Sequence, residues 1–242
     1  MSRRVRWPLS LSLSGPVKRR LRTLRRLLQF SHAALSDEGS APDLFTVYHD
    51  LYRHPDLDRQ PGGWRYRGQF YPDYLTVGGA SHAICGKALQ VCRGKGIDVG
   101  AGLWPLPGAI PIDVWRGPGA GRLLEDMQDG SLDYVFSSHC LEHIDDWRGA
   151  LASWVKKLKG GAVIFLYLPH PSCEIWHPGT PFIGDAHRWI PTPQLITGAL
   201  EELGCEAVDV ADEPDAMQSF HVVGQVRDEF KDSFAVAENL PA

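Results

Sequence analysis

The segment GKGIDVGAGLWPLPGAIPIDV, residues 94–114, constrains the fold more than any other part of the chain. Its pattern predicts an apolar strand, a glycine turn at 100–102 and a second apolar strand that ends on Asp113. Only the seven residues 103–109 separate the turn from the second strand, and two of them are proline. A parallel crossover usually needs at least about 10–12 residues, including its helix. The segment is therefore either a nucleotide site whose helix is missing or a glycine-rich loop between strands.

Strands and helices alternate through the rest of the chain. We expect strands near 95–100, 109–114, 132–137, 161–168, 204–210 and 218–225, with a weak extra strand at 122–124. Helices are expected over 80–92, over 146–158 behind an Asp cap, and from the Thr-Pro pair at 192–193 to near 204. The Gly-Gly pair at 160–161 should end the second helix. This alternation predicts a mostly parallel sheet with helices on both faces.

Charge is distributed unevenly along the chain. Residues 1–36 contain nine Lys and Arg and no Asp or Glu, so the remaining residues hold 16 basic and 29 acidic side chains. An acidic body argues against nucleic acid as a partner. The basic segment has three interpretations: a solvated helix that packs its leucines on the body, a peripheral membrane contact through residues 15–34, or an organelle transit peptide.

The cysteine content and the hydropathy of the chain indicate the cellular compartment in which it is expected. The five cysteines are scattered without a CxxC pair, which fits a reducing cytosol and offers no zinc signature. No apolar run approaches the roughly 20 residues of a membrane span. We therefore expect a cytoplasmic protein, with membrane association as the alternative that the basic segment leaves open.

The composition divides the chain into four segments. We expect a basic tail and amphipathic helix at 1–36, an irregular aromatic lid on the acceptor side at 37–79, a cofactor-binding domain at 80–226 and a tail at 227–242. A helix is expected at 42–53 within the second segment. Its aromatic residues, including Trp64, Tyr66 and Phe70, would suit stacking on a sugar face or a flat ring.

Chemistry-bearing residues follow the carboxyl ends of the expected strands, where open α/β sheets bind ligands. The first strand brings Asp98 and the turn Gly100–Gly102, and the second brings Asp113. The strand expected at 132–137 leads into SSHCLEH, residues 137–143, and the strand expected at 161–168 leads into YLPHP, residues 167–171. An acid in the position of Asp113 accepts the hydroxyls of a ribose. A dinucleotide would also need a helix N-terminus for its pyrophosphate, and the short crossover disfavours one.

The ordered motifs resemble those of class I S-adenosylmethionine-dependent methyltransferases, over roughly residues 80–226. They are IDVGAG, IPIDV, DGSLDYVFSSHCLEHIDDWRGALASWVKKLKGGAVIFLYLPHP and SFHVVGQVR. More narrowly, the chain is similar to a bacterial branch with a short first crossover and an SSHxLEH motif. The resemblance implies an α/β fold: a Rossmann-like sheet with an antiparallel last strand, here with an N-terminal helical extension. It also implies S-adenosyl-L-methionine as the cofactor.

The resemblance carries family roles to residues of this chain. Asp98, Gly100, Ala101 and Gly102 would hold the methionine end, and Asp113 would bind the ribose. Asp126 with the Met127 backbone would meet the adenine, with Glu125 as the rival acid. Ser137, Ser138 and His139 would lie nearest the transferred methyl.

Several histidines are candidates for a base that serves a hydroxyl acceptor. We expect His139 and His170 to contact the acceptor or act as its base, whereas His143 is expected to fix a turn and His187 to bond its own loop. Asp185, His170, His177 and His187 match no metal-binding motif, so we expect no metal.

Three functions remain open at this point. The first is methyl transfer to a small-molecule or glycan acceptor, as O-methylation. The second is a nicotinamide-dependent oxidoreductase. The third is a catalytically inactive protein that retains cofactor or partner binding.

Overall fold

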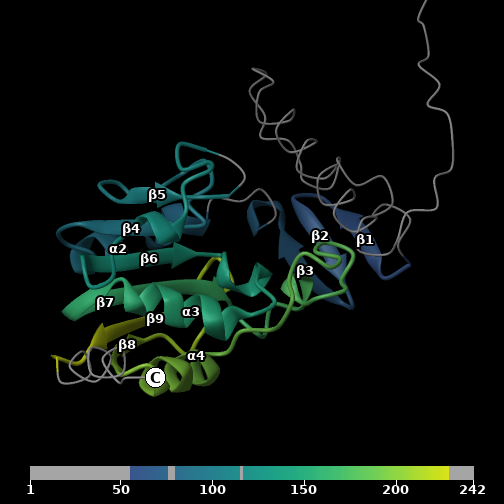
Figure 1. The fold of residues 1–242 in the computed structure, drawn as a ribbon. Helices are drawn as coiled ribbons and strands as arrows, with labels where there is room; N and C mark the ends of the chain where they lie inside the picture. The colour runs from purple at the N-terminus through teal and green to yellow at the C-terminus, as the bar shows by residue number, and fades with distance from the viewer. Residues whose placement is uncertain (1–54, 76–79, 115–116, 229–242) are drawn as a thin grey trace, which may run out of the picture.

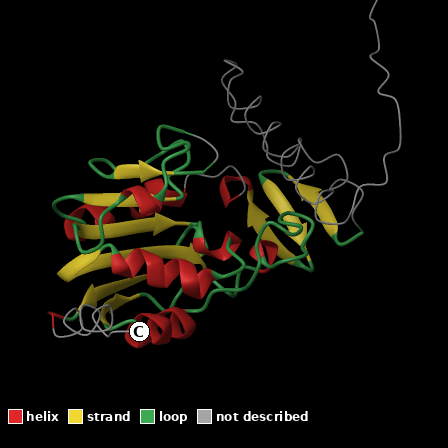
Figure 2. Cartoon of the chain, in the orientation of Figure 1, coloured by secondary structure: helices red, strands yellow, loops and turns green. Residues whose placement is uncertain are grey.

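The computed structural model describes residues 55–75, 80–114 and 117–228 (Figures 1 and 2). The helices expected at 15–34 and 42–53 lie outside these residues. None of the helices in the described ranges is long and apolar enough to cross a lipid bilayer.

A six-stranded sheet forms the larger part of the fold. Its strands are β4 (Gly96–Val99), β5 (Ile110–Ile112), β6 (Leu132–Ser138), β7 (Leu158–Pro169), β8 (Cys205–Val210) and β9 (Ser219–Val226), in the order β5-β4-β6-β7-β9-β8. The first four are parallel, whereas β9 runs antiparallel to both of its neighbours. This confirms the expected Rossmann-like sheet with its antiparallel last strand. The strand order reverses between β4 and β6, where such sheets bind ligands.

Helices cover both faces of this sheet (Figure 2). They are α2 (Ala80–Val91), α3 (Trp147–Lys156) and α4 (Pro193–Glu202). Successive strand residues alternate between the faces: Val135 packs with the residues of α3 and α4, and Phe136 packs with those of α2. The expected caps are present, because Asp146 accepts a hydrogen bond at the start of α3 and Thr192 at the start of α4. Short 3-10 helices lie at Asp73–Leu75 (η2), Leu124–Asp126 (η3), Leu141–His143 (η4) and Glu174–Trp176 (η5).

Two local expectations were wrong. The Gly160–Gly161 pair lies inside β7, because α3 already ends at Lys156 and the strand starts at Leu158. In place of a strand at 122–124, the described chain has an isolated bridge between Asp113 and Ala120, followed by η3.

The aromatic segment is also more regular than expected. Residues 57–72 form an antiparallel sheet of β1 (Leu57–Gln60), β2 (Gly63–Tyr66) and β3 (Gln69–Pro72), to the right of the larger sheet in Figure 1. Trp64 and Tyr66 are buried, and the edge of each ring meets Phe182. They share a small core with Cys173 and Ile175. These two aromatic rings therefore pack against the insertion at 171–191 instead of presenting a stacking surface.

The β5 edge of the larger sheet is covered by its own chain. β5 has three residues, and the loop after it folds back along the outer side. The Asp113 amide donates to the Gly119 carbonyl at 3.1 Å, and the Gly121 amide donates to the Asp113 carbonyl at 2.8 Å. A Cβ on Gly119 would lie 2.7 Å from the Pro111 carbonyl, so the approach needs glycine.

Candidate functional site

The glycine turn after β4 is packed too closely for any side chain at its first position. Gly100 has φ +76°, and its amide donates to the Ile112 carbonyl at 2.9 Å. A Cβ on Gly100 would lie 2.5 Å from the Sγ of Cys140, in the segment after β6. Gly102 also has a positive φ, +54°. The turn is therefore fixed between β5 and the β6 end, with its backbone free of side chains.

Asp98 fixes the crossover that follows the turn. Its side chain is buried, and its Oδ2 accepts a hydrogen bond from the Leu106 amide at 2.7 Å. The pKa of Asp98 is raised to about 7, chiefly by burial and to a lesser extent by the nearby Asp113, against the lowering effect of the Leu106 amide. The described crossover contains no helix, as expected from its length and prolines.

Asp113 joins the two strand ends. Its Oδ2 accepts a hydrogen bond from the Gly102 amide at 2.9 Å, and its side chain is half-buried. The acid expected to bind a ribose thus lies directly beside the glycine turn. This contact brings together the two parts of the site that the sequence placed on neighbouring strands.

The residues expected at the adenine lie on the loop before β6. Asp126 is exposed, and its Oδ2 accepts from the Leu123 amide at 3.3 Å. The carbonyl of Met127 accepts from the Lys157 Nζ at 2.7 Å. Their role toward an adenine stays a prediction.

The end of β6 brings Ser137, Ser138 and His139 to the same edge of the sheet. Ser137 is buried, and its hydroxyl donates to the Val99 carbonyl at 2.9 Å, which ties β6 to β4. Ser138 is half-buried. His139 has φ +49°, a conformation that non-glycine residues rarely adopt, and its amide donates to the Tyr167 carbonyl at 2.8 Å.

The His139 ring is held among aromatic and polar groups. Its Nε2 lies 2.9 Å from the Ser219 hydroxyl, and its ring meets Tyr167 and Trp176 edge-on. The pKa of His139 is lowered to about 3, chiefly by burial and also by the nearby His143. The imidazole is therefore neutral at pH 7.

His170 follows β7 but turns toward the loop before β9. Its Nδ1 lies 2.7 Å from the Ser172 hydroxyl and its Nε2 lies 2.8 Å from the Asp212 carbonyl. Both ring nitrogens thus have partners in the protein. Its contact with an acceptor stays a prediction.

Sequence reasoning did not single out Glu142, which is fully buried between two of the histidines it considered. Glu142 Oε1 lies 3.9 Å from His143 Nε2 and 3.8 Å from His187 Nε2. Burial raises the pKa of the Glu142 carboxyl to about 8. Among the described residues, the four considered together in the sequence (Asp185, His170, His177 and His187) form no cluster of possible metal ligands. The cluster that does form consists of Glu142, His143 and His187. The HCLEH sequence at residues 139–143 was the pattern that could have indicated it.

A pocket of about 280 Å³ lies between the start of α2 and the crossover. Residues 103–107 form one wall, and Ser81, His82 and Cys85 form the other. The Trp104 ring, 46% exposed, lies 5.9 Å from the His82 ring. The crossover without a helix therefore shapes a hollow next to the Asp98 contact.

Comparison with known proteins gives both a family match and similar structures. Residues 116–166 match a family described as "Methyltransferase domain". A methyltransferase from Archaeoglobus fulgidus, named as SAM-dependent, is 16% identical, with 60% of this chain and 93% of that chain covered at a TM-score of 0.48. An S-adenosylmethionine-dependent methyltransferase from Mesorhizobium loti is 16% identical, with 61% and 98% covered at a TM-score of 0.47.

A third solved structure covers more of this chain. It is the 1,6-didemethyltoxoflavin-N1-methyltransferase of Burkholderia thailandensis with bound 1,6-didemethyltoxoflavin and S-adenosylhomocysteine. It is 13% identical, with 91% of this chain and 94% of that chain covered at a TM-score of 0.46. A search of curated proteins gives no match.

The family match includes the SSHCLEH motif after β6, residues 137–143, on which the resemblance rested. Around it, the mostly parallel sheet, its antiparallel last strand and the glycine turn are those expected from the sequence. Residues 116–166 therefore match a methyltransferase domain, and they lie within a mostly parallel sheet of the expected Rossmann-like class.

Proposed function

We propose that the chain transfers the methyl group of S-adenosylmethionine to a hydroxyl of a small-molecule or glycan acceptor. The observation that carries the proposal is the hydrogen bond between Asp113 and the Gly102 amide. It sets an acid beside a glycine turn where the strand order of the sheet reverses, the place where such sheets bind nucleosides.

The residues present suit this cofactor. The turn at Gly100–Gly102 lets the backbone approach the methionine end, and Asp98 stabilises the crossover behind it. Asp113 would accept the ribose hydroxyls, and Asp126 with Met127 would meet the adenine edge. When bound, S-adenosylmethionine supplies a methyl group on a cationic sulfonium. The protein aligns the acceptor with that carbon and excludes water.

The acceptor would lie beyond the ends of β6 and β7. Ser137 and Ser138 line the cofactor side, and His139 faces the insertion at 171–191 through its contact with Trp176. A neutral imidazole can accept a hydrogen bond from an acceptor hydroxyl without first losing a proton. We therefore assign His139 as the positioned base and keep His170 as the second candidate. The geometry favours His139, because only its Nε2 has a hydrogen-bond partner among the described residues, whereas both ring nitrogens of His170 bond neighbouring groups.

The other functions have less support. A nicotinamide dinucleotide would need a helix N-terminus after the glycine turn, and the described crossover has none. A catalytically inactive binding protein would not need the neutral imidazole at the strand edge. We propose a cytoplasmic enzyme that does not bind nucleic acid and contacts membranes peripherally through residues 15–34, which suits a glycan on a lipid carrier.

The test begins with ligand binding. Isothermal titration with S-adenosylhomocysteine should give saturable binding, and NAD should give none; the reverse result would reject the proposal. Transfer of labelled methyl from S-adenosylmethionine should then be measured on lipid-linked glycans, free sugars and phenols. A product that is stable to mild base and shows a methoxy signal by NMR identifies an ether. An N-methyl product would contradict the hydroxyl acceptor while leaving the cofactor assignment intact.

A further inference from the structure

The carboxylate of Glu142 is buried without a hydrogen bond to any described residue. It lies in η4, directly after β6, and its side chain has no exposed surface. Neither of its oxygens has a hydrogen-bond partner among the described residues. A buried carboxylate without a partner is costly, and such groups in proteins are normally paired, hydrogen-bonded or coordinated to a metal.

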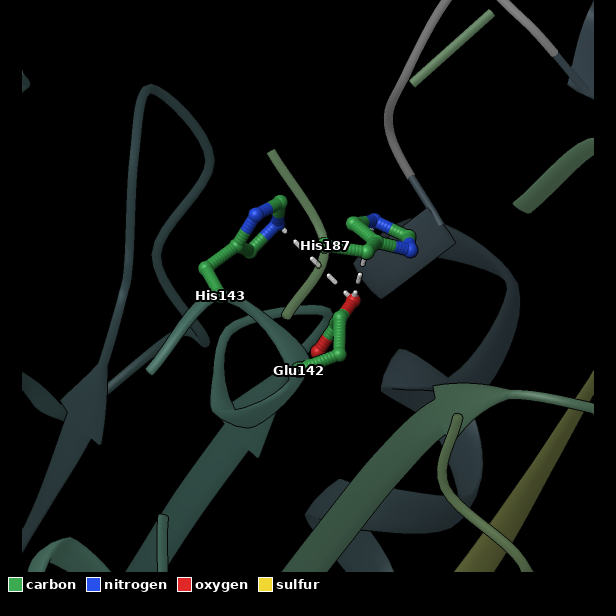
Figure 3. A group of neighbouring side chains, drawn as sticks. All are labelled: Glu142, His143 and His187. Atoms are coloured by element: carbon green, nitrogen blue, oxygen red, sulfur yellow. Dashed lines mark ion pairs between the residues drawn. The ribbon is translucent and has the colours of Figure 1, made fainter. Parts of the chain in front are cut away.

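Two imidazoles point their Nε2 atoms at this carboxylate (Figure 3). The distances from Oε1 are 3.9 Å to His143 and 3.8 Å to His187. Both are longer than a hydrogen bond of about 2.7–3.2 Å. Because no hydrogen bond joins the three groups, a shared proton does not explain the arrangement.

The opposite nitrogen of each ring fixes its tautomer. The Nδ1 of His143 lies 3.0 Å from the Ala186 carbonyl, and the Nδ1 of His187 lies 2.6 Å from the Trp176 carbonyl. A carbonyl oxygen only accepts, so in each neutral ring Nδ1 carries the proton and Nε2 carries a lone pair. Two lone pairs thus face one carboxylate. A metal-bound histidine characteristically donates its other N–H to a carbonyl or carboxylate in this way.

We propose that Glu142, His143 and His187 form a binding site for a divalent transition-metal cation of the Zn²⁺ type. Two imidazole nitrogens and a carboxylate oxygen are a donor set that such cations prefer. The ligand atoms of the three residues lie within 4.8 Å of one another. Around a tetrahedral zinc with bonds of about 2.0–2.1 Å, ligand atoms lie about 3.4 Å apart. The Glu–His distances therefore need to shorten by only about 0.4–0.5 Å. The site differs from the sequence expectation of no metal, and of the four residues considered there it uses only His187, together with Glu142 and His143.

A further imidazole adjoins the site. The Nδ1 of His139 lies 3.6 Å from the same Glu142 oxygen. Ser219 donates its hydroxyl hydrogen to the Met217 carbonyl, so it accepts from His139 Nε2, and the lone pair of Nδ1 also faces Glu142. Because His139 is assigned as the base for the acceptor, the fourth position of the cation would be taken by water entering past His143, whose side chain is 44% exposed.

The cation would tie two distant parts of the chain together. His187 belongs to the insertion at 171–191, whereas Glu142 and His143 follow β6. Backbone contacts already join the two segments, because the Arg188 amide donates to the Glu142 carbonyl at 2.8 Å. A metal at this point would fasten the insertion beside His139, at the proposed acceptor side.

The test uses the full-length chain without an affinity tag, treated with EDTA and then dialysed. Titration with Zn²⁺ should show one saturable site per chain and raise the unfolding midpoint by several degrees. Glu142→Gln and His143→Ala should each weaken binding by at least about tenfold, since even changes to groups behind a ligand cost about 10–100-fold. His82→Ala removes an exposed histidine outside the cluster and should bind Zn²⁺ like the unchanged chain.

Cobalt(II) provides a second readout. The Co²⁺ complex should show visible d–d bands without the intense near-ultraviolet band of a thiolate, which separates this site from binding at Cys140. Near-ultraviolet circular dichroism checks that the variants are folded, and exposed His143 is the safer position if Glu142→Gln does not fold. The absence of saturable binding, or affinities in both cluster variants equal to that of His82→Ala, would overturn the proposal.

Discussion

Asp113 Oδ2 lies 2.9 Å from the amide nitrogen of Gly102, so the acid after β5 holds the glycine turn after β4. In the proposed function the same carboxylate serves two purposes, since it fixes the turn and would also bind the ribose. The two purposes are separable by substitution.

We expect Asp113→Ala to weaken S-adenosylhomocysteine binding by about 10–100-fold, since hydrogen bonds to a charged group contribute about 1.5–3 kcal/mol. Asp113→Asn keeps an acceptor for the Gly102 amide and should fold normally, while still losing affinity. Isothermal titration measures both, with Asp58→Ala on the exposed side of β1 as the control. Unchanged affinity in both Asp113 variants would place the ribose elsewhere.

Gly100→Ala should destabilise the fold by about 2–4 kcal/mol, because a positive φ and a steric overlap add together. The new methyl would lie 2.5 Å from Cys140. Gly108→Ala is the matched control, with φ +87° and nothing within 4 Å, so it should cost only the backbone strain of about 1 kcal/mol. Urea unfolding measures the difference, and equal losses in the two variants would contradict the packing described here.

Asp98 should make stability depend on pH. Its pKa is raised from 3.8 to about 7 in the folded chain, so its contribution is complete below about pH 4 and is lost as the pH rises through 7. The unchanged protein should therefore lose more stability between about pH 5 and about pH 8 than Asp98→Asn does. Urea titrations at both pH values check this, with Asp145→Asn at an exposed carboxylate as the control. A variant with the same pH profile as the unchanged chain would speak against it.

Trp64 tests whether the three-stranded sheet is structural. It is 1% exposed, so Trp64→Ala should cost about 3–5 kcal/mol of stability. Phe70, on β3 and 43% exposed, should cost less than about 1 kcal/mol when changed to Ala. Thermal unfolding compares the two. If Trp64→Ala kept full stability and altered only acceptor use, the interpretation as an acceptor lid would return.

Deletion of residues 1–36 should leave S-adenosylhomocysteine affinity unchanged and abolish most sedimentation with anionic vesicles. The deleted segment has nine basic side chains, and each contributes about 1 kcal/mol near an anionic surface. Binding of the full chain should also fall as salt is raised. Equal sedimentation of both chains, or none by the full chain, would remove the membrane proposal.

Local sequence patterns were sufficient to predict the larger sheet and the glycine turn. The caps Asp146 and Thr192 act on amides three residues away, and continuous apolar runs mark buried parallel strands, so both are legible in sequence. The turn at Gly100 and the acid Asp113 were predictable because the register of parallel strands brings their ends together.

Nonlocal contacts account for what the sequence did not show. The three-stranded sheet buries Trp64 against Phe182, more than a hundred residues away, although the pairs Pro61–Gly62 and Arg67–Gly68 were available as hairpin signals. Glu142 is likewise buried only when the insertion brings His187 over it. A sequence window of the length of one helix cannot reveal the burial of Trp64 or of Glu142, because each depends on residues far along the chain.

The β5 edge has a consequence for how this protein can assemble. The backbone N–H and C=O groups of Ile110 and Ile112 face β4, so the backbone groups of Pro111 and Asp113 point outward from the sheet edge. Proline has no N–H to offer, and both backbone groups of Asp113 already bond the returning loop. A foreign strand would find almost no free donors there, so this side of the sheet resists edge-to-edge aggregation. The loop that bonds the end of β5 thus also keeps the sheet from growing.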